Sequence, residues 1–401
     1  MTMKTLAAAA TLLASVAVPA FAQDEAVRIL VLDDMTGIYS GNGGSNPLRA
    51  VEMAVADFGG EVLGQPIEVI SADHQNKPDV GSAIAQQMID ERGVTAINLG
   101  GSSAVGLAAQ ARAGEAGVIT LGTGGYAPNF STDQCTPYSF HWAPTTRELA
   151  RGVAGAIVKE GGDSWYMITA DYVFGHSLSA EATAAVEDAG GQVLGETVHP
   201  LNTNDMASAL LEAQGSGAKV FGMANAGTDL ELTIKQAANF GLSEHLAAML
   251  VFENNVQALG LEQAQNIRTT TSFYWDLNDA TRDFGNRIME ANGGQVPTMG
   301  HAGAYSAVRH YLEAVEAAGT TDADTVTAKM KELPLTDGFY QNSSIQENGR
   351  VVFDLLLVEV NTPEESTGPA DLYDVVATIP GKDLFLSAAD SGCPLTAAAT
   401  N

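Results

Sequence analysis

One serine of the sequence stands in a pattern close to that of a catalytic nucleophile. Residues 175–179 read Gly-His-Ser-Leu-Ser, which differs from the nucleophile elbow G-x-S-x-G at the fifth position. The elbow has glycine there because its strand and helix pack closely. The segment is therefore more typical of the first turn of a helix. An exported hydrolase that uses Ser177 remains the alternative from another functional class.

Other motifs of catalysis and cofactor binding are incomplete or absent from the sequence. Residues 41–46 fail the dinucleotide pattern G-x-G-x-x-G at its last position and lie well past the end of the preceding predicted strand. There is no G-x-x-x-x-G-K-[ST] and no H-E-x-x-H, and the seven histidines are scattered. The two cysteines show no zinc-ligand spacing with histidines. We therefore expect no enzymatic activity, no cofactor and no metal.

Small and hydroxyl residues follow two predicted strands in the first half of the chain. Ser102 and Ser103 stand in a Gly-Gly-Ser-Ser-Ala segment, and Thr123 and Gly124 stand in a Gly-Thr-Gly-Gly segment. In open α/β sheets, ligands bind at the carboxyl ends of the strands. Backbone N–H groups at a helix N-terminus there favour an anion such as a carboxylate. Ordinary helix capping is the competing explanation for either loop alone.

Complementary groups follow predicted strands in the second half of the chain. Tyr172 and Phe174 could close an aromatic lid over a ligand, and Asn225 and Ala226 follow another strand. Glu253 directly follows an apolar run that we predict to be a strand, so its side chain could face a cleft. A carboxylate in that place would suit a ligand ammonium group, whereas a solvated loop acid is the alternative explanation.

The elements that must position these loops alternate between strand and helix. This β-α-β order predicts a parallel, doubly wound sheet, and its restart after residue 148 predicts a second lobe. The length of 401 residues is also too great for one small core. We predict strands over residues 27–32, 67–70, 95–99, 118–121, 165–169, 192–194, 220–224, 248–252 and 351–360, and long helices over 148–160, 280–291 and 303–318.

Three segments are typical of crossings between lobes, namely residues 141–145, 271–277 and 348–351. Several crossings make a hinge with few degrees of freedom, so opening and closing is the expected motion. The predicted fold class is α/β, with two doubly wound parallel-sheet lobes joined by three hinge segments. The expected parts are a signal peptide (1–22), lobe one (23–142 plus 275–350), lobe two (143–274 plus 351–386) and a C-terminal tail (387–401).

The first 22 residues have the three parts of a cleavable secretory signal. Lys4 supplies the positive charge, residues 6–18 form an apolar run, and Ala20 and Ala22 form an A-x-A site. A membrane anchor helix is the alternative, but the apolar run is short for a span of about 20 residues. We therefore expect export through the inner membrane, with cleavage after Ala22.

Charge and cysteine content narrow the class of protein further. The net charge is −29, which argues against binding nucleic acid or an anionic membrane surface, because both require Lys and Arg. An even number of cysteines in an exported chain predicts one disulfide, between Cys135 and Cys393. It would join the C-terminal tail to a mid-chain loop. Two unrelated thiols are the alternative.

Several short motifs are spread along the chain, namely Met35-Thr36-Gly37, Asp73-His74-Gln75-Asn76-Lys77-Pro78, Gly101-Ser102-Ser103, Thr169-Ala170-Asp171-Tyr172-Val173-Phe174-Gly175 and Phe273-Tyr274-Trp275-Asp276. Together they resemble the periplasmic leucine/isoleucine/valine-type binding proteins of ABC importers, and the resemblance covers nearly the whole mature chain. It implies two lobes joined by three hinge strands, a ligand held between them, and a periplasmic location.

The resemblance also implies roles for the candidate residues. In amino-acid binders of this family, a serine and backbone amides of lobe one hold the ligand carboxylate, and Ser102 or Ser103 with the Thr123-Gly124 loop match those positions. An acid of lobe two holds the ammonium group, and Glu253 falls near that place. This chain departs from the amino-acid binders in its glycine-rich loop at 122–126 and in segments 225–227 and 253–255.

Two further positions complete the implied site. Tyr172 or Phe174 matches an aromatic residue that packs over the ligand, and Tyr39 and Asn42 lie in the first loop, which lines the side-chain pocket. The implied protein is a monomer that captures a small carboxylate, first of all an amino acid, and delivers it to an ABC permease and ATPase. An aromatic carboxylate, an amide or urea is the alternative ligand, and a sensor lobe for a membrane receptor is the alternative role.

Overall fold

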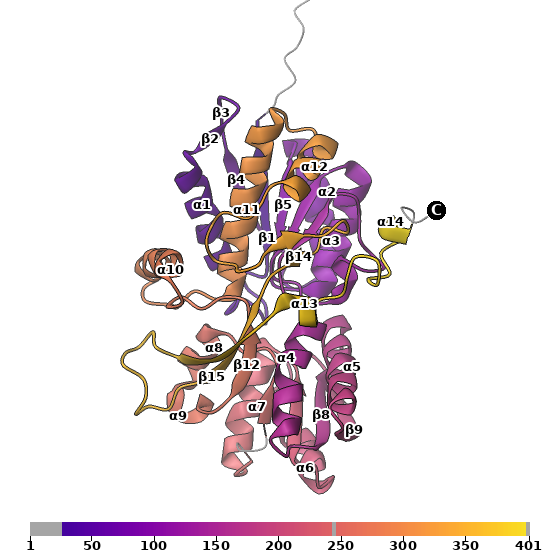
Figure 1. The fold of residues 1–401 in the computed structure, drawn as a ribbon, viewed down its shortest axis with the longest axis vertical. Helices are drawn as coiled ribbons and strands as arrows, with labels where there is room; N and C mark the ends of the chain where they lie inside the picture. The colour runs from indigo at the N-terminus through magenta and orange to yellow at the C-terminus, as the bar shows by residue number, and fades with distance from the viewer. Residues whose placement is uncertain (1–25, 243–245, 398–401) are drawn as a thin grey trace, which may run out of the picture.

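The computed structural model describes residues 26–242 and 246–397, which form two α/β lobes stacked along the long axis (Figure 1). The fold class predicted from the sequence is thereby confirmed. The predicted signal peptide and its cleavage site lie outside the described residues. Within the described ranges, no helix combines the length and apolar character needed to cross a membrane.

Lobe one contains a five-stranded parallel sheet in the order β4-β1-β5-β6-β7. Leu30 and Leu32 of β1 pack against α2 and α3, while Ile29 and Val31 pack on the opposite face against α1 and α11. Burial on both faces explains why residues 29–32 of this strand are all apolar. The elements are β1 (Arg28–Asp33), α1 (Asn46–Phe58), β4 (Glu68–Asp73), α2 (Pro78–Arg92), β5 (Ala96–Leu99), α3 (Ser103–Ala116), β6 (Ile119–Gly122), β7 (Ser139–His141), α11 (Met299–Ala318) and α12 (Ala323–Glu332).

Lobe two repeats this plan with a four-stranded parallel sheet in the order β11-β10-β8-β9. The predicted strand at residues 248–252 is wrong in its extent. The strand ends at Ala248, and residues 249–252 form a buried connection to α8, so their apolar character reflects burial in a loop. The elements are α4 (Thr146–Lys159), β8 (Ser164–Ala170), α5 (Val173–Asp188), β9 (Gln192–His199), α6 (Ala207–Gly215), β10 (Val220–Ala224), α7 (Gly227–Asn239), β11 (Leu246–Ala248), α8 (Glu253–Leu259) and α9 (Leu261–Ala264).

A third, antiparallel sheet lies beside lobe two and consists of β12 (Arg268–Thr271), β15 (Leu355–Val360) and β16 (Tyr373–Ile379). The sequence pattern predicts β15 but not β16, whose residues are mostly exposed. The remaining elements are β2 (Glu61–Val62), β3 (Gln65–Pro66), η1 (Pro128–Phe130), α10 (Asp279–Ala291), β13 (Ser344–Ile345), β14 (Val351–Val352), α13 (Gly381–Leu384) and α14 (Pro394–Ala397).

Before the C-terminal segment that follows β16, the described part of the chain passes between the lobes at three places. It leaves lobe one after β7 to enter α4, returns between β12 and α10, and crosses again between β14 and β15 (Figure 1). Two crossings are in direct contact, because His141 of β7 pairs with Arg350 in a parallel bridge. The lobes are therefore joined by a narrow bundle of neighbouring segments.

The predicted disulfide joins Cys135 to Cys393, with 5.9 Å between the two Cα atoms. It fixes the C-terminal tail to lobe one. A few residues earlier, the backbone carbonyl of Leu384 in α13 accepts a hydrogen bond from Arg147 Nε of α4 at 3.3 Å. The C-terminal segment therefore contacts both lobes and runs alongside the hinge (Figure 1).

Candidate functional site

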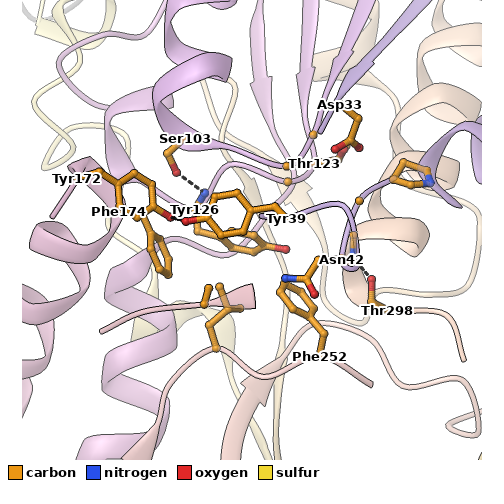
Figure 2. Close-up of a pocket in the computed structure, with 18 residues that line it drawn as sticks. Asp33, Tyr39, Asn42, Ser103, Thr123, Tyr126, Tyr172, Phe174, Phe252 and Thr298 are labelled. Atoms are coloured by element: carbon orange, nitrogen blue, oxygen red, sulfur yellow. Dashed lines mark hydrogen bonds between the residues drawn. The ribbon is translucent and has the colours of Figure 1, made fainter. Parts of the chain in front are cut away.

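A cavity lies where the two lobes meet. Its walls come from the loops at the carboxyl ends of strands in both parallel sheets, which is where ligands bind in open α/β sheets. The lining residues are Asp33, Tyr39, Asn42, Gly43, Pro47, Gly100, Gly101, Ser103, Thr123, Gly124, Tyr126, Tyr172, Phe174, Ala226, Leu250, Phe252, Thr298 and Gly300 (Figure 2).

Six helices begin at this cavity, three from each lobe. The lining residues at their starts are Pro47 of α1, Ser103 of α3, Thr298 of α11, Tyr172 of α5, Ala226 of α7 and Phe252 of α8. The N-cap residues of α3, α5 and α7 accept no hydrogen bond through their side chains. The first N–H groups of a helix have no partner within it, so the cavity faces several partly positive helix ends.

Two glycine loops of lobe one are in direct backbone contact. A Cβ atom on Gly124 would lie 2.6 Å from the backbone nitrogen of Gly101 and 2.9 Å from the Cα atom of Gly100, so only glycine allows this approach. Gly101 has a φ of +68°, which also favours glycine. Thr123 Oγ1 shares a hydrogen bond with the side chain of Asn98 at 3.1 Å. These contacts present backbone groups of both loops to the cavity without side-chain bulk.

The two adjacent serines at the start of α3 have different environments. Ser103 lines the cavity, and its hydroxyl oxygen accepts hydrogen bonds from the backbone N–H groups of Tyr126 and Ala127 at 3.0 and 3.1 Å. Ser102 is the N-cap residue of α3 and does not line the cavity. Its buried hydroxyl has no hydrogen-bond partner among the described residues. Of the two, Ser103 is the one that lines the cavity.

The loop after β1 is held by the carboxylate of Asp34. Its Oδ1 atom accepts a hydrogen bond from the Gly37 N–H at 2.6 Å, and its Oδ2 atom accepts one from the Tyr39 N–H at 3.0 Å. Asp73 at the end of β4 accepts a hydrogen bond from the Met35 N–H at 3.0 Å. These bonds fold the loop over the strand ends and place the Tyr39 ring in the cavity wall.

Five aromatic rings form one continuous part of the cavity wall. The ring centroids of Tyr172 lie 6.2 Å from Tyr39 and 5.8 Å from Phe174. Those of Tyr126 lie 6.4 Å from Phe174 and 5.9 Å from Phe252. In Figure 2, Tyr172 and Phe174 occupy the opposite side of the view from Asp33. The cavity therefore has an aromatic side and a side formed by glycines and an acid.

Side chains from the two lobes bond directly to each other across the cavity entrance. Tyr39 Oη donates a hydrogen bond to Tyr172 Oη at 2.5 Å, and Asn254 Nδ2 donates one to Asn42 Oδ1 at 2.8 Å. Both tyrosine rings are largely shielded from solvent. The structure therefore represents a closed arrangement of the lobes.

The substitution Tyr172→Phe should favour the open arrangement. It deletes the acceptor of the Tyr39 hydroxyl in the closed state, whereas water can satisfy that hydroxyl when the lobes separate. A net loss of about 1 kcal/mol corresponds to an approximately five-fold lower closed-to-open ratio. Single-molecule energy transfer between dyes on α2 and α6 measures the ratio. The matched control is Tyr166→Phe, which deletes a hydroxyl bonded to Thr197 within lobe two. An unchanged ratio in Tyr172→Phe would show that the bond does not hold the lobes together.

Eight of the eleven site residues predicted from the sequence line the cavity, and three do not. The three that lie outside are Ser102, Asn225 and Glu253. Asn225 is fully buried, and its amide nitrogen lies 3.2 Å from His199 Nε2 and 3.1 Å from Thr233 Oγ1, so it stabilises the loop behind Ala226. The eight residues that the structure brings together are Tyr39, Asn42, Ser103, Thr123, Gly124, Tyr172, Phe174 and Ala226.

Glu253 is the first residue of α8 and is buried, with 1% of its surface exposed. Its Oε1 atom has no hydrogen-bond partner in the described part of the chain, and burial raises its pKa to about 8. Burial, and to a lesser extent the charge of Glu253, raises the pKa values of Tyr126, Tyr274 and Tyr373. Glu253 is not among the residues that line the cavity.

Several lining residues were not predicted, and some of them had a signal in the sequence. Asp33 directly follows the first predicted strand, the same position that identified the serine and threonine loops. Thr298 is the N-cap of α11, which begins at Met299 rather than at residue 303 as predicted. Leu250 and Phe252 were assigned to a strand that ends earlier.

Ser177 lies on α5 and does not line the cavity. Its hydroxyl shares a hydrogen bond with Thr146 Oγ1 at 2.6 Å. The neighbouring His176 instead contacts Asp171 Oδ1 at 2.9 Å on the surface. The segment thus forms part of the α4–α5 contact, and no nucleophile–base pair is formed by these two residues.

Two α/β lobes that close over a cavity built from the strand ends of both define a two-lobed ligand-binding protein. Residues 26–368 match the model of the periplasmic binding protein family, and the chain belongs to this family. Its fold is that of the type I periplasmic binding proteins of ABC transporters, as the sequence motifs indicate. Proteins of this family bind small-molecule ligands and work with ABC transporter components.

Solved structures with this fold include two that are similar in sequence. A periplasmic binding protein from Burkholderia mallei is 42% identical, with a TM-score of 0.89 over 92% of this chain and 99% of that one. A branched-chain amino acid ABC transporter periplasmic ligand-binding protein from Burkholderia xenovorans LB400 is 32% identical, with a TM-score of 0.83 over 92% and 100%. A solute-binding protein of an ABC transporter from R. palustris, solved with benzoate, is 18% identical, with a TM-score of 0.82 over the same shares, and is similar in fold alone.

Proposed function

We propose that this chain captures a small carboxylate-bearing ligand, first of all an amino acid, in the cavity between its lobes. After export it would deliver the ligand, as a monomer, to an ABC permease and ATPase of the inner membrane. The domain limits and the cleaved signal peptide predicted from the sequence belong to this proposal. The single observation that supports it most is the convergence of helix N-termini on a cavity that both lobes close.

The charge of the cavity favours a ligand with a negative group. Among the described residues that line it, there is no Lys, Arg or His. Attraction for an anion would therefore come from the backbone, through the N–H groups of the first turns of α3, α5 and α7. Ser103, Thr123 and Gly124 lie beside the α3 start and would hold the carboxylate. The hydroxyl hydrogen of Ser103 can donate to it while the oxygen accepts from the loop.

The aromatic wall supports an aromatic carboxylate as the second candidate ligand. Tyr39, Tyr126, Tyr172, Phe174 and Phe252 offer stacking and edge contacts to a planar ring. The benzoate complex of the R. palustris protein shows that the same fold can hold such a ligand in that protein. The branched-chain amino acid protein from B. xenovorans, which is more similar in sequence, supports the amino acid.

Thermal unfolding with a panel of carboxylates tests the proposal. The protein is first freed of bound ligand by unfolding and refolding, and its midpoint is then measured with each L-amino acid, benzoate and 4-hydroxybenzoate. A ligand at 100 times its dissociation constant stabilises the folded state by about 2.7 kcal/mol, so a true ligand raises the midpoint in a concentration-dependent way. Calorimetric titration then gives the affinity.

The matched control for each compound that binds is its primary amide, which keeps the shape and removes the negative charge. We expect the amide to bind at least ten-fold more weakly, because the helix ends no longer face an anion. Equal binding of the amide and the carboxylate, or binding of urea and neutral amides alone, would contradict carboxylate recognition.

A further inference from the structure

The parallel sheet of lobe one places Asp33 at the cavity wall. Asp33 is the last residue of β1, which lies between β4 and β5, and its side chain is fully buried. Asp33 is among the residues that line the cavity, together with Asn42 and Thr298 (Figure 2). An acid in this position is not required by the sheet, because the remaining residues of β1 are held by apolar packing.

Three glycines make room for this carboxyl group. A Cβ atom on Gly43 would lie 2.3 Å from Asp33 Oδ1, one on Gly100 would lie 2.0 Å from Oδ2, and one on Gly101 would lie 2.6 Å from Oδ1. These glycines come from the loops after β1 and β5. Any other residue at these positions would displace the acid, so the loops form a cradle that holds the carboxyl group in one place.

Only one of the two carboxyl oxygens of Asp33 has a hydrogen-bond partner among the described residues. Asp33 Oδ1 accepts a hydrogen bond from the Asp34 N–H at 2.7 Å. Asp33 Oδ2 has no hydrogen-bond partner among the described residues, although it is buried. Leaving a buried polar atom without a partner costs about 1–3 kcal/mol, and more for a charged one. Burial raises the pKa of Asp33 to about 8, and the nearby charges of Asp34 and Asp73 act in the same direction.

We propose that Asp33 Oδ2 accepts a hydrogen bond from a cationic nitrogen of the ligand, so that the cavity selects a zwitterion, that is, an amino acid. This rests on the proposed function, because it assigns the second charge of the same ligand. The carboxylate of the ligand faces the start of α3 and the Thr123-Gly124 loop, while its ammonium group pairs with Asp33 in the adjacent glycine cradle. The charge of one lining residue then distinguishes an amino acid from the corresponding simple carboxylic acid.

Asp33 has two advantages over Glu253 as this partner. Asp33 is among the residues that line the cavity, whereas Glu253 is not. The unpartnered oxygen of Asp33 also lies beside Gly100, which borders the loop that would hold the ligand carboxylate. The ammonium and carboxylate groups of an α-amino acid are attached to the same carbon atom, so they need binding groups that are close together.

The substitution Asp33→Asn tests the assignment with paired probes. The pairs are L-leucine with 4-methylpentanoate and L-phenylalanine with 3-phenylpropanoate, each measured by calorimetric titration. Asparagine keeps the size of the side chain and the acceptor for the Asp34 N–H but carries no charge. We expect Asp33→Asn to weaken binding of the amino acid by about 10- to 100-fold, as a charge-assisted hydrogen bond is lost, and to leave the simple acid unchanged.

The matched control is Glu253→Gln, which neutralises the other buried acid of raised pKa. It should leave the affinity for the amino acid within about two-fold of wild type. If Glu253→Gln causes the loss and Asp33→Asn does not, Glu253 is the ammonium partner and the assignment to Asp33 is wrong. The unfolding midpoint of Asp33→Asn without ligand shows that the variant is folded, since it should equal or exceed that of wild type.

The outcomes also separate this inference from the proposed function. If only simple carboxylates bind to wild type, carboxylate capture stands and the role of Asp33 is overturned. If neither member of any pair binds, and no other carboxylate of the panel does, the proposed function fails as well. If Asp33→Asn weakens both members of a pair equally, Asp33 shapes the cavity and does not select the cation.

Proton release gives a second readout that a purely structural role would not produce. Binding of an ammonium group requires the ionised form of Asp33, so the pKa of about 8 must fall in the complex. The other titratable groups near Asp33 are Asp34, Asp73, His74 and Tyr126. At pH 7, titration of wild type in phosphate and in Tris should show release of about one proton, and Asp33→Asn should show none. From pH 6 to pH 8, the affinity of wild type should rise by up to about ten-fold per pH unit.

Discussion

Replacement of Arg350 by methionine is expected to lower the free energy of unfolding by about 3–5 kcal/mol, because it leaves a buried acid without its partner. Arg350 Nη2 lies 3.1 Å from Glu148 Oε2, and the two side chains are only 5% and 3% exposed. Removing one member of such a pair is more destabilising than the pair itself is stabilising. Urea unfolding followed by tryptophan fluorescence measures the difference.

The effect should be large because Arg350 also connects the hinge segments. Its Nη1 atom donates hydrogen bonds to the backbone carbonyls of His141 and Ala143, and its guanidinium lies 4.7 Å from the centre of the Phe385 ring. One side chain thus joins two of the three crossings, the start of α4 and the C-terminal segment. Methionine retains much of the apolar packing but none of these polar contacts.

The matched control is the double variant Arg350→Met with Glu148→Gln. Glutamine can still accept the hydrogen bond that Glu148 Oε2 receives from the Thr145 N–H at 2.6 Å, but it carries no charge. The double variant should therefore be more stable than Arg350→Met alone. Equal stability of the two would show that lost packing and hinge contacts, and not the unpaired charge, cause the effect. A loss below about 1 kcal/mol in the single variant would contradict the expectation.

Removal of the disulfide is the second change with a large expected effect. Cys135 and Cys393 are separated by 258 residues, and a loop of this length contributes about 4–5 kcal/mol in the chain-entropy model. We expect the free energy of unfolding of the double variant Cys135→Ser with Cys393→Ser, measured by urea unfolding, to be lower than that of wild type by about this amount. Wild type in dithiothreitol should behave in the same way.

The double serine variant, measured with and without dithiothreitol, is the control for the disulfide prediction. The double serine variant has no bond to reduce, so dithiothreitol should not change its midpoint. If reduction lowers the free energy of unfolding of wild type by less than about 1 kcal/mol, the C-terminal tail is held mainly by packing. That packing includes the contact of α13 with α4 and the hydrogen bond from Gln346 Nε2 to the Leu386 carbonyl at 3.0 Å.

Most of the fold could be predicted from the sequence because its strands are buried on both faces. Such strands appear as short apolar runs, as in β1 and β10, and they are separated by helices with clear starts such as Pro78 of α2. Strand β16 gave no such signal because its residues are mostly exposed. The apolar run at 248–252 wrongly predicted a strand, because a buried loop needs apolar residues as much as a buried strand does.

The candidate site could be predicted in part, from the rule that ligands lie at strand ends. The rule identified Ser103, Thr123 and Tyr172 because small, hydroxyl or aromatic residues followed predicted strands. The strand-end rule did not identify Asp33, although Asp33 ends a strand. In the sequence, an acid at that position cannot be told from a solvated loop residue. The burial of Asp33 depends on glycines that are far apart in the sequence, and their approach to one carboxyl group is set by the pairing of β1 with β5.

The position of the disulfide also sets the order of events during biogenesis. Cys135 is synthesised 258 residues before Cys393, which at 5–20 residues per second is a delay of about 10–50 seconds. During that time Cys135 has no correct partner within the chain, so an oxidant can only form mixed disulfides with it. The native bond is therefore among the last steps of maturation, and a chain that ends before residue 393 keeps Cys135 as an unpaired thiol.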